Sequence, residues 1–251
     1  MELIKTITRA IPEPIADIGR ELIGKKCYGV LISDVRFLEW PVSDEVVLCM
    51  KLAISKAIGL GIVVASSIIK VPQLMKLVNA RSGAGLSFTG NALECGSYLA
   101  SFAYAARNGF AFSTYGEQAF LFIQDVGVMF LLLMYSNNTL TSFAVIPIVA
   151  AITWYAVISV PGPSAGVLAL LQAATIPLGL AAKVPQIMSA YKTKSTGQLS
   201  AIAVFAYLGG SLARVFTTVQ EVDDSIVLIG VLLGTVLNGI IALQMIIYWR
   251  K

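Results

Sequence analysis

The chain has 251 residues, of which 57% are hydrophobic and 13% charged, with a net charge of +4 and no histidine. Soluble domains are about half apolar and a quarter charged, so this composition excludes an ordinary soluble domain and also a disordered chain. The missing histidine removes the commonest general base and metal ligand, and the three cysteines form no zinc or redox motif. We expect a membrane protein with no catalytic activity, no cofactor, no bound metal and no nucleic-acid partner.

The N-terminal region, residues 1–50, differs from the rest of the chain. It holds eight of the 14 acidic residues and no apolar run long enough to cross a bilayer. Ile15, Ile18 and Leu22 are spaced three and four apart, which predicts a short amphipathic helix. That helix could lie on a membrane surface or cap a helix bundle. No cleaved signal peptide is expected, because no apolar run ends at a small-residue cleavage site.

After Ser43, a plausible N-cap, apolar segments dominate the chain. Seven of them are long enough to cross a bilayer as helices. We expect these spans near residues 55–78, 88–107, 117–136, 140–160, 166–190, 199–219 and 226–249. The predicted fold class is an all-α membrane protein with seven transmembrane helices.

The two halves of the chain match each other at an offset of 113 residues. The block Lys70-Val71-Pro72-Gln73 recurs as Lys183-Val184-Pro185-Gln186, and later matches keep this register. The offset covers four helices, so the first and fifth helices run in the same direction. This predicts two parallel three-helix bundles joined by a linking helix, with a site between the halves. The expected regions are 1–50, 51–139 (first bundle), 140–162 (linking helix) and 163–251 (second bundle).

Pro72 and Pro185 each remove one helix hydrogen bond and should bend the first and fifth helices. Gln73 and Gln186 place an amide beside each bend. One interpretation is a pair of hinges that open and close one end of a central cavity. The alternative is two static kinks that improve packing.

Ionisable groups inside membrane spans are candidates for function. Lys70 and Lys183 occupy equivalent positions in the two repeats. They could face the cavity and hold an anionic phosphate head group, or they could extend to the membrane interface. Asp125 and Asn238 are also equivalent and lie near the middle of the third and seventh helices. They could bind sugar hydroxyls, or an Asp–Lys pair could lock the bundle.

Glu94 and Arg214 also lie within predicted spans. Either could line a substrate path, although structural roles are favoured for both. Arg214 could bind phosphate, pair with Glu221 or extend to the interface.

Cys27 and Cys49 lie on the same side of the membrane in the predicted topology. They could form a disulfide that contributes roughly 3 kcal/mol, or remain free thiols.

The orientation follows from the cations in the short loops. The side that holds the first, third and fifth loops and the C-terminus should be cytosolic, because it carries no acid and six cations: Lys76, Arg81, Lys192, Lys194, Arg250 and Lys251. The N-terminus is then luminal or extracellular. The one N-x-[ST] sequon, Asn137-Asn138-Thr139, lies on the cytosolic side and should stay unglycosylated.

Two Pro-Gln motifs, one in each three-helix half, resemble the PQ-loop superfamily. This group includes sugar uniporters, lysosomal amino-acid exporters and receptors that retrieve escaped luminal proteins. Within it, the segments Gly59–Val63, Lys70–Gln73, Ser195–Ile202 and Gly209–Thr217 resemble the mannose-P-dolichol utilization defect 1 family. The resemblance covers roughly residues 50–249.

This resemblance implies a multi-pass protein of the endoplasmic reticulum membrane that is needed for using mannose-P-dolichol and glucose-P-dolichol as luminal sugar donors. These donors serve N-glycan precursors, GPI anchors and protein mannosylation. The implied partners are the two dolichol-linked sugars and membrane lipids. Flipping, lateral delivery and chaperoning of the lipid are all compatible with it. In sugar uniporters of the superfamily, asparagines on the helices of Asp125 and Asn238 contact the sugar, and this chain departs by carrying aspartate in the first half.

Three other functions stay open. A small-solute transporter could use Asp125 as a proton site. A receptor for luminal peptide tails would need cations reachable from the lumen, and only Lys56 and Arg214 qualify. An intramembrane glycosyltransferase is disfavoured, because the chain has no D-x-D motif and no histidine base.

Overall fold

A computed structural model describes Thr8 and residues 11–38, 43–83, 86–136, 139–196 and 201–248. Within these ranges the chain forms helices and turns and no strand, which confirms the all-α class. The chain divides into two compact units, Met1–Leu60 and Gly61–Lys251. Asn137 and Asn138 of the sequon lie outside the described residues.

The N-terminal unit begins with α2 (Glu13–Ile23), the amphipathic helix expected from the sequence. Its apolar face is open, since Ile15 and Ile18 are 60% and 58% exposed. On its polar face Arg20 Nη1 lies 3.0 Å from a Glu13 carboxylate oxygen and 2.8 Å from one of Asp17. These hydrogen bonds to carboxylates raise the pKa of the Arg20 guanidinium.

Three short helical segments follow, α3 (Lys25–Tyr28), η1 (Gly29–Ser33) and η2 (Arg36–Leu38). A disulfide joins Cys27 of α3 to Cys49 of α4 (Asp44–Ser66). Around it Val30, Leu31 and Val46 form a small buried core. The disulfide therefore fastens the interrupted N-terminal segments to the first long helix.

Helices occupy all seven predicted spans, the first of which begins in the N-terminal unit and continues into the second. After α4 they are α5 (Val71–Ala80), α6 (Phe88–Arg107), α7 (Phe112–Tyr135), α8 (Thr139–Thr153) continuing as η3 (Trp154–Ile158), α9 (Ala165–Thr193), α10 (Ala201–Glu221) and α11 (Ser225–Ile247). The first span differs from the prediction in two ways: α4 begins eleven residues early, at Asp44, and a turn separates it from α5. The acidic residues Asp44 and Glu45 in its first turn suit the positive end of a helix dipole, which explains the early start.

Five helical stretches among the described residues are long and apolar enough to cross a membrane. They are Asp44–Ala80, Phe112–Tyr135, Ala165–Thr193, Ala201–Glu221 and Ser225–Ile247, and Phe143–Ile158 is a shorter apolar helix. α6 is 20 residues long but carries Asn91 and Glu94. It packs against α7, α9 and η3, so neighbouring helices rather than lipid surround much of it.

The two repeats end their proline-containing helices in the same way. Arg81 follows α5 with φ of 47°, and Lys194 follows α9 with φ of 54°. Left-handed backbone is uncommon outside glycine, and these residues are 113 positions apart. The local geometry therefore repeats with the sequence offset.

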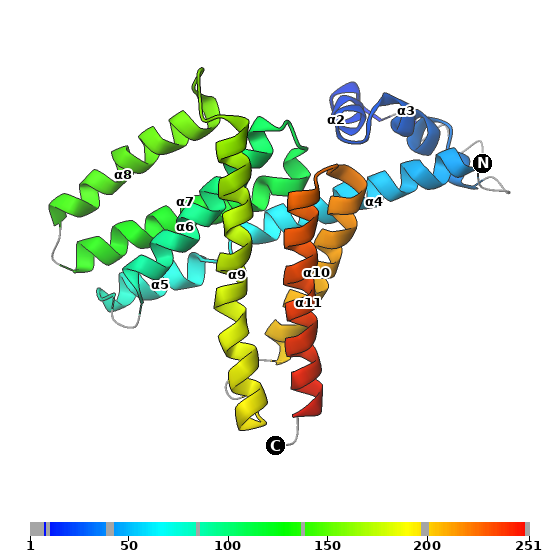
Figure 1. The fold of residues 1–251 in the computed structure, drawn as a ribbon. Coiled ribbons are helices and arrows are strands. Elements are labelled where there is room, and N and C mark those ends of the chain that lie inside the picture. Colours follow the sequence, from blue (N-terminus) through cyan, green and yellow to red (C-terminus); the bar gives the residue numbers. More distant parts are fainter. Residues whose placement is uncertain are drawn as a thin grey trace. The chain divides into compact units, whose positions relative to one another are not determined.

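Helix packing within the second unit brings together the residues of the candidate functional site. α7 packs against α5 and α6 in the first half, and α11 packs against α9 and α10 in the second. Figure 1 shows α9, α10 and α11 running side by side. Contacts between the halves come from α6 with α9 and from α7 with α10.

Candidate functional site

The break between α4 and α5 is held by a residue that the sequence analysis did not single out. Gln124 of α7 donates from Nε2 to the carbonyl of Ser66 and accepts from the backbone N–H of Lys70, both at 2.8 Å. These are backbone groups at either side of the turn that precedes Pro72. We had expected Gln73 to be the amide beside the bend. A glutamine next to Asp125, within the apolar run Ala119–Tyr135 of α7, was the available signal.

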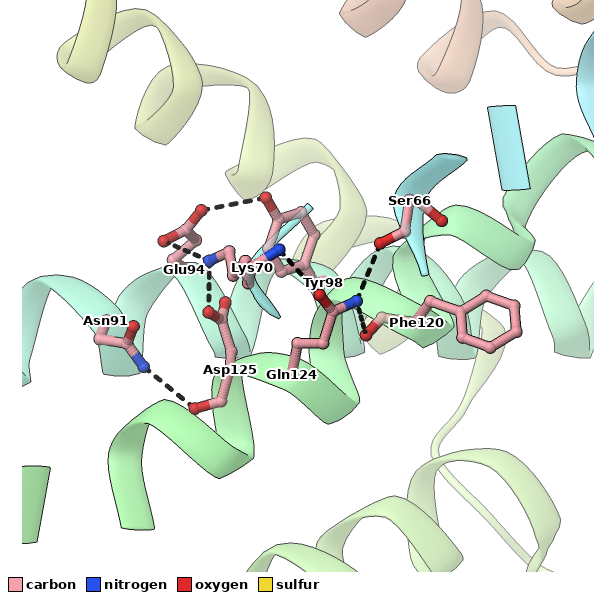
Figure 2. Close-up of polar contacts among 8 residues, drawn as sticks. All are labelled: Ser66, Lys70, Asn91, Glu94, Tyr98, Phe120, Gln124 and Asp125. Carbon is pink, nitrogen blue, oxygen red and sulfur yellow. Dashed lines mark hydrogen bonds and ion pairs between the residues drawn. The ribbon is translucent and has the colours of Figure 1, made fainter. Parts of the chain in front are cut away.

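Lys70, Glu94, Tyr98 and Asp125 form a polar group that we call the first-repeat cluster. Lys70 Nζ pairs with Asp125 and also lies 2.9 Å from Glu94 Oε2 (Figure 2). Tyr98 donates its hydroxyl to Glu94 Oε1 at 3.0 Å. Lys70 is 8% exposed and Asp125 is fully buried. The two carboxylates more than neutralise the ammonium, which favours a locking role for this lysine over phosphate binding.

Asp125 is oriented by a neighbour on α6. Asn91 donates from Nδ2 to the Asp125 backbone carbonyl at 3.2 Å (Figure 2). The carboxylate Oδ1 receives the Lys70 ammonium, and Oδ2 is buried without a hydrogen-bond donor among the described residues.

The second repeat has a different environment at the equivalent positions. Lys183 Nζ donates to Asn238 Oδ1 at 2.5 Å, and Asn238 Nδ2 donates to the Tyr207 carbonyl at 3.3 Å. Tyr207 stands where the first repeat has Glu94. Within the described ranges Lys183 has no carboxylate partner. The two equivalent lysines therefore differ, because Lys70 pairs with two carboxylates and Lys183 pairs with a neutral amide.

Lys183 lies at the boundary of two cavities. The first, of about 240 Å³, is enclosed by α6, α7, α9 and α11 and is called the inter-repeat cavity below. The second, of about 360 Å³, is lined by Lys183 with Glu94, Tyr98, Gln186 and Asn238, among others. The structure thus brings Lys183, Asn238, Glu94 and Gln186 to a common space, whereas Asp125 lines neither cavity.

Arg214 on α10 joins the two halves. Its Nη1 donates to the carbonyls of Ser113 and Thr114 at 3.2 and 3.1 Å, and its Nη2 lies 2.8 Å from Glu117 Oε2. Glu221, the acid we had considered as its partner, accepts instead from the Ser113 hydroxyl at 2.8 Å. Of the alternatives for Arg214, this geometry fits a structural link between α10 and α7.

The second Pro-Gln motif lies inside an unbroken helix, because α9 runs through Pro185 to Thr193. The first Pro-Gln motif, in contrast, directly follows the break between α4 and α5. Leu237 stands where the first half has Gln124 and has no polar group to bond the backbone. The two proline sites are therefore not equivalent in this conformation.

Comparison with known families agrees with this arrangement. The family described as PQ loop repeat matches residues 54–114 and again residues 167–227. Two stretches of the chain therefore match the PQ-loop repeat, and they are called the first and second PQ-loop repeats below. The matched stretches begin 113 residues apart, which is the offset found within the sequence. The first PQ-loop repeat contains Lys70 and Glu94, and the second contains Lys183 and Arg214.

A curated relative extends the comparison. Human "Solute carrier family 66 member 3" is 24% identical over 170 residues, which cover 68% of this chain and 82% of the relative. The PQ-loop repeats and the apolar helices support a multi-pass membrane protein of a transporter-like, non-enzymatic kind. The resemblance to the PQ-loop superfamily is thereby supported.

Proposed function

We propose that this protein handles lipid-linked sugar phosphates, mannose-P-dolichol and glucose-P-dolichol, by taking the phospho-sugar head group between its two PQ-loop repeats. The isoprenoid tail would stay in the surrounding lipid. The protein would act in the endoplasmic reticulum membrane and make these donors usable for luminal glycosylation. Flipping, presentation and chaperoning of the lipid are three forms of this same function.

The observation that carries the proposal is that Lys183 pairs with no carboxylate in the part of the chain that the structure describes. Its only hydrogen-bond acceptor among the described residues is the neutral amide of Asn238, and it lines both cavities. A lysine ammonium binds phosphate as a point charge. A half-buried ammonium without a counter-ion is less stable than a paired one, so an anionic ligand would stabilise it. Lys70 is less suited, because Asp125 and Glu94 already neutralise it.

The location and the donor lipids rest on the resemblance of the sequence segments to the mannose-P-dolichol utilization defect 1 family. The orientation rests on the loop cations, which favour a luminal N-terminus and a cytosolic C-terminus. Under this orientation Asn137 stays unmodified in cells that glycosylate luminal sequons. A glycan on Asn137 would overturn the orientation.

Reconstitution tests the proposal. The protein is placed in vesicles with labelled mannose-P-dolichol, and movement of the lipid between leaflets and its use by a luminal mannosyltransferase are measured. Lys183→Gln should lower both at least tenfold. Lys192→Gln is the matched control, because Lys192 is an exposed lysine in the last turn of the same helix. Equal activity of wild type and protein-free vesicles in both assays would contradict the function.

The second candidate is a small-solute transporter. It is favoured by the similarity to a protein named as a solute carrier. It is also favoured by the buried Oδ2 atom of Asp125, which has no donor among the described residues and could take a proton. Uptake of free hexose or amino acid into the same vesicles, driven by a pH gradient and lost in Asp125→Asn, would support this candidate over the first.

A further inference from the structure

The inter-repeat cavity contains two glutamine side chains that have unused hydrogen-bond acceptors. Gln172 of α9 is 8% exposed, and Gln118 comes from α7. The Oε1 atoms of both are buried without a donor from any residue in the described part of the chain. Both side chains line the cavity. Burying an amide oxygen without a hydrogen bond is unfavourable, so these groups point to a ligand that supplies donors.

Three of the five hydroxyl groups that line the same cavity also keep acceptor capacity. Thr114 donates its hydroxyl hydrogen to the Ala111 carbonyl, and Thr175 donates to the Gln172 carbonyl. A hydroxyl has one hydrogen, so each of these oxygens keeps only its acceptor capacity. Tyr104 likewise donates to an Asp224 carboxylate oxygen at 2.5 Å. The cavity therefore presents several acceptors within a lining that is otherwise mostly apolar.

Among the described residues that line the cavity, Lys183 is the one with a charged side chain, and it lies C-terminal to Gln172 and Thr175 on α9. Gln172, Thr175, Gly179 and Lys183 line the cavity from α9, and their spacing of three and four places them along one face of the helix. From Gln172 to Lys183 the axial rise is about 16 Å. The inter-repeat cavity thus offers acceptors at one end and a cation at the other.

We propose that Gln172 and Gln118 form a subsite that binds the hydroxyl groups of a single monosaccharide ring, with the ring's phosphate directed toward Lys183. This inference rests on the proposed function and adds to it the groups that recognise the sugar. Acceptors need a ligand with hydroxyl or ammonium donors, and the nearby lysine charge disfavours an ammonium. A hydroxyl-rich ring with an anionic substituent satisfies both ends.

The size of the cavity agrees with one ring. Its volume of about 240 Å³ is below the range of about 300–1,000 Å³ typical for drug-sized ligands. Two glycines contribute to this space, because a Cβ built at Gly179 or Gly234 would meet no atom within 4 Å. Larger side chains at these positions would project into the cavity without first displacing a neighbour.

Equilibrium binding to the purified full chain in nanodiscs tests the subsite. The probes are mannose 1-phosphate, which carries both the ring and the anion, and inorganic phosphate, which carries the anion alone. Gln172→Met and Gln118→Met should each weaken mannose 1-phosphate about tenfold, because a ring donor loses its acceptor. Both should leave phosphate binding unchanged.

Gln244→Met is the matched control. Gln244 is equally buried at 8% exposure and also has an Oε1 without a donor among the described residues, but it contacts the Ile187 carbonyl outside the cavity lining. Its replacement should not change sugar binding. Gly234→Leu should abolish mannose 1-phosphate binding while the thermal transition of the protein is retained.

Each of three results would overturn the subsite. The first is that wild type binds phosphate as tightly as mannose 1-phosphate, and the second is that Gln172→Met and Gln244→Met change the affinity for mannose 1-phosphate equally. The third is that a folded Gly234→Leu protein binds mannose 1-phosphate as wild type does. Mannose-P-dolichol added to the nanodiscs should compete with mannose 1-phosphate. Glutamine-dependent binding without such competition would keep the subsite, assign it to soluble sugar phosphates and count against the lipid-linked function. Lipid movement in vesicles that is insensitive to both glutamines would keep the function and reject the subsite.

Discussion

Replacing both members of the Lys70–Asp125 pair should harm the protein less than replacing either one. Asp125 is fully buried and the Lys70 side chain is 9% exposed, so each single change leaves a buried charge without its main partner. Such a loss costs about 3–5 kcal/mol. For a chain of this size each kcal/mol shifts the melting temperature by about 2–4 °C. Asp125→Leu alone should therefore lower it by about 6–20 °C.

The double variant Lys70→Met/Asp125→Leu removes both charges and should recover most of this loss, because a packed apolar pair can replace a buried ion pair. Glu94 loses a partner as well, but its side chain is 46% exposed and such a pair contributes about 0–1 kcal/mol. Intrinsic-fluorescence melting of the four proteins in one detergent measures the cycle. Lys183→Met is the comparison, and its loss should be smaller, because its partner Asn238 is neutral. A double variant that loses the sum of the two single losses would refute the reasoning.

Three further changes have expected outcomes. Gln124→Leu leaves the Lys70 N–H without its acceptor and leaves the Ser66 carbonyl with only a 3.4 Å bond from the Ile69 N–H. We expect a loss of about 1–3 kcal/mol and faster amide hydrogen exchange confined to residues 66–71; unchanged exchange there would exclude this role. Cys27→Ser should lower the free energy of unfolding by about 3 kcal/mol, because the disulfide closes a loop with a separation of 22 residues. The double variant Cys27→Ser/Cys49→Ser should lose no more than this. Non-reducing peptide mapping of wild type should recover the disulfide-linked peptides. Arg214→Met should lower the melting temperature more than Glu117→Gln, since Arg214 also bonds two backbone carbonyls; equal effects would mean that the ion pair alone matters.

The sequence predicted the parts of the fold that depend on hydropathy and repetition. Apolar segment length located all seven helical segments, and the 113-residue offset is reproduced in the two PQ-loop matches and in the left-handed residues Arg81 and Lys194. Hydropathy and the internal repeat can both be recognised in the sequence without knowledge of the contacts between helices. The start of α4 was missed because its first turns carry charges, which a search for apolar runs excludes.

The site was predicted only in part. Repeat symmetry selected Lys70 and Lys183 together, but it could not reveal that they differ, because the difference comes from residues on other helices. Glu94 on α6 reaches Lys70, and at the equivalent place on α10 stands Tyr207. Gln172 and Gln118 lie outside the two Lys-Val-Pro-Gln motifs. Their Oε1 atoms can be recognised as lacking a donor among the described residues only when the surrounding helices are in place.

The central claim is that a polar cavity lies between the repeats, and cysteine accessibility tests it most directly. Thr175 lines the inter-repeat cavity, whereas Leu170 on the same helix is 70% exposed on an apolar surface that would face lipid. In a Cys95→Ser background, Thr175→Cys should react with a water-soluble thiol reagent and be protected by mannose 1-phosphate, and Leu170→Cys should stay unreactive. Reaction at Leu170→Cys together with an inert Thr175→Cys would contradict the account.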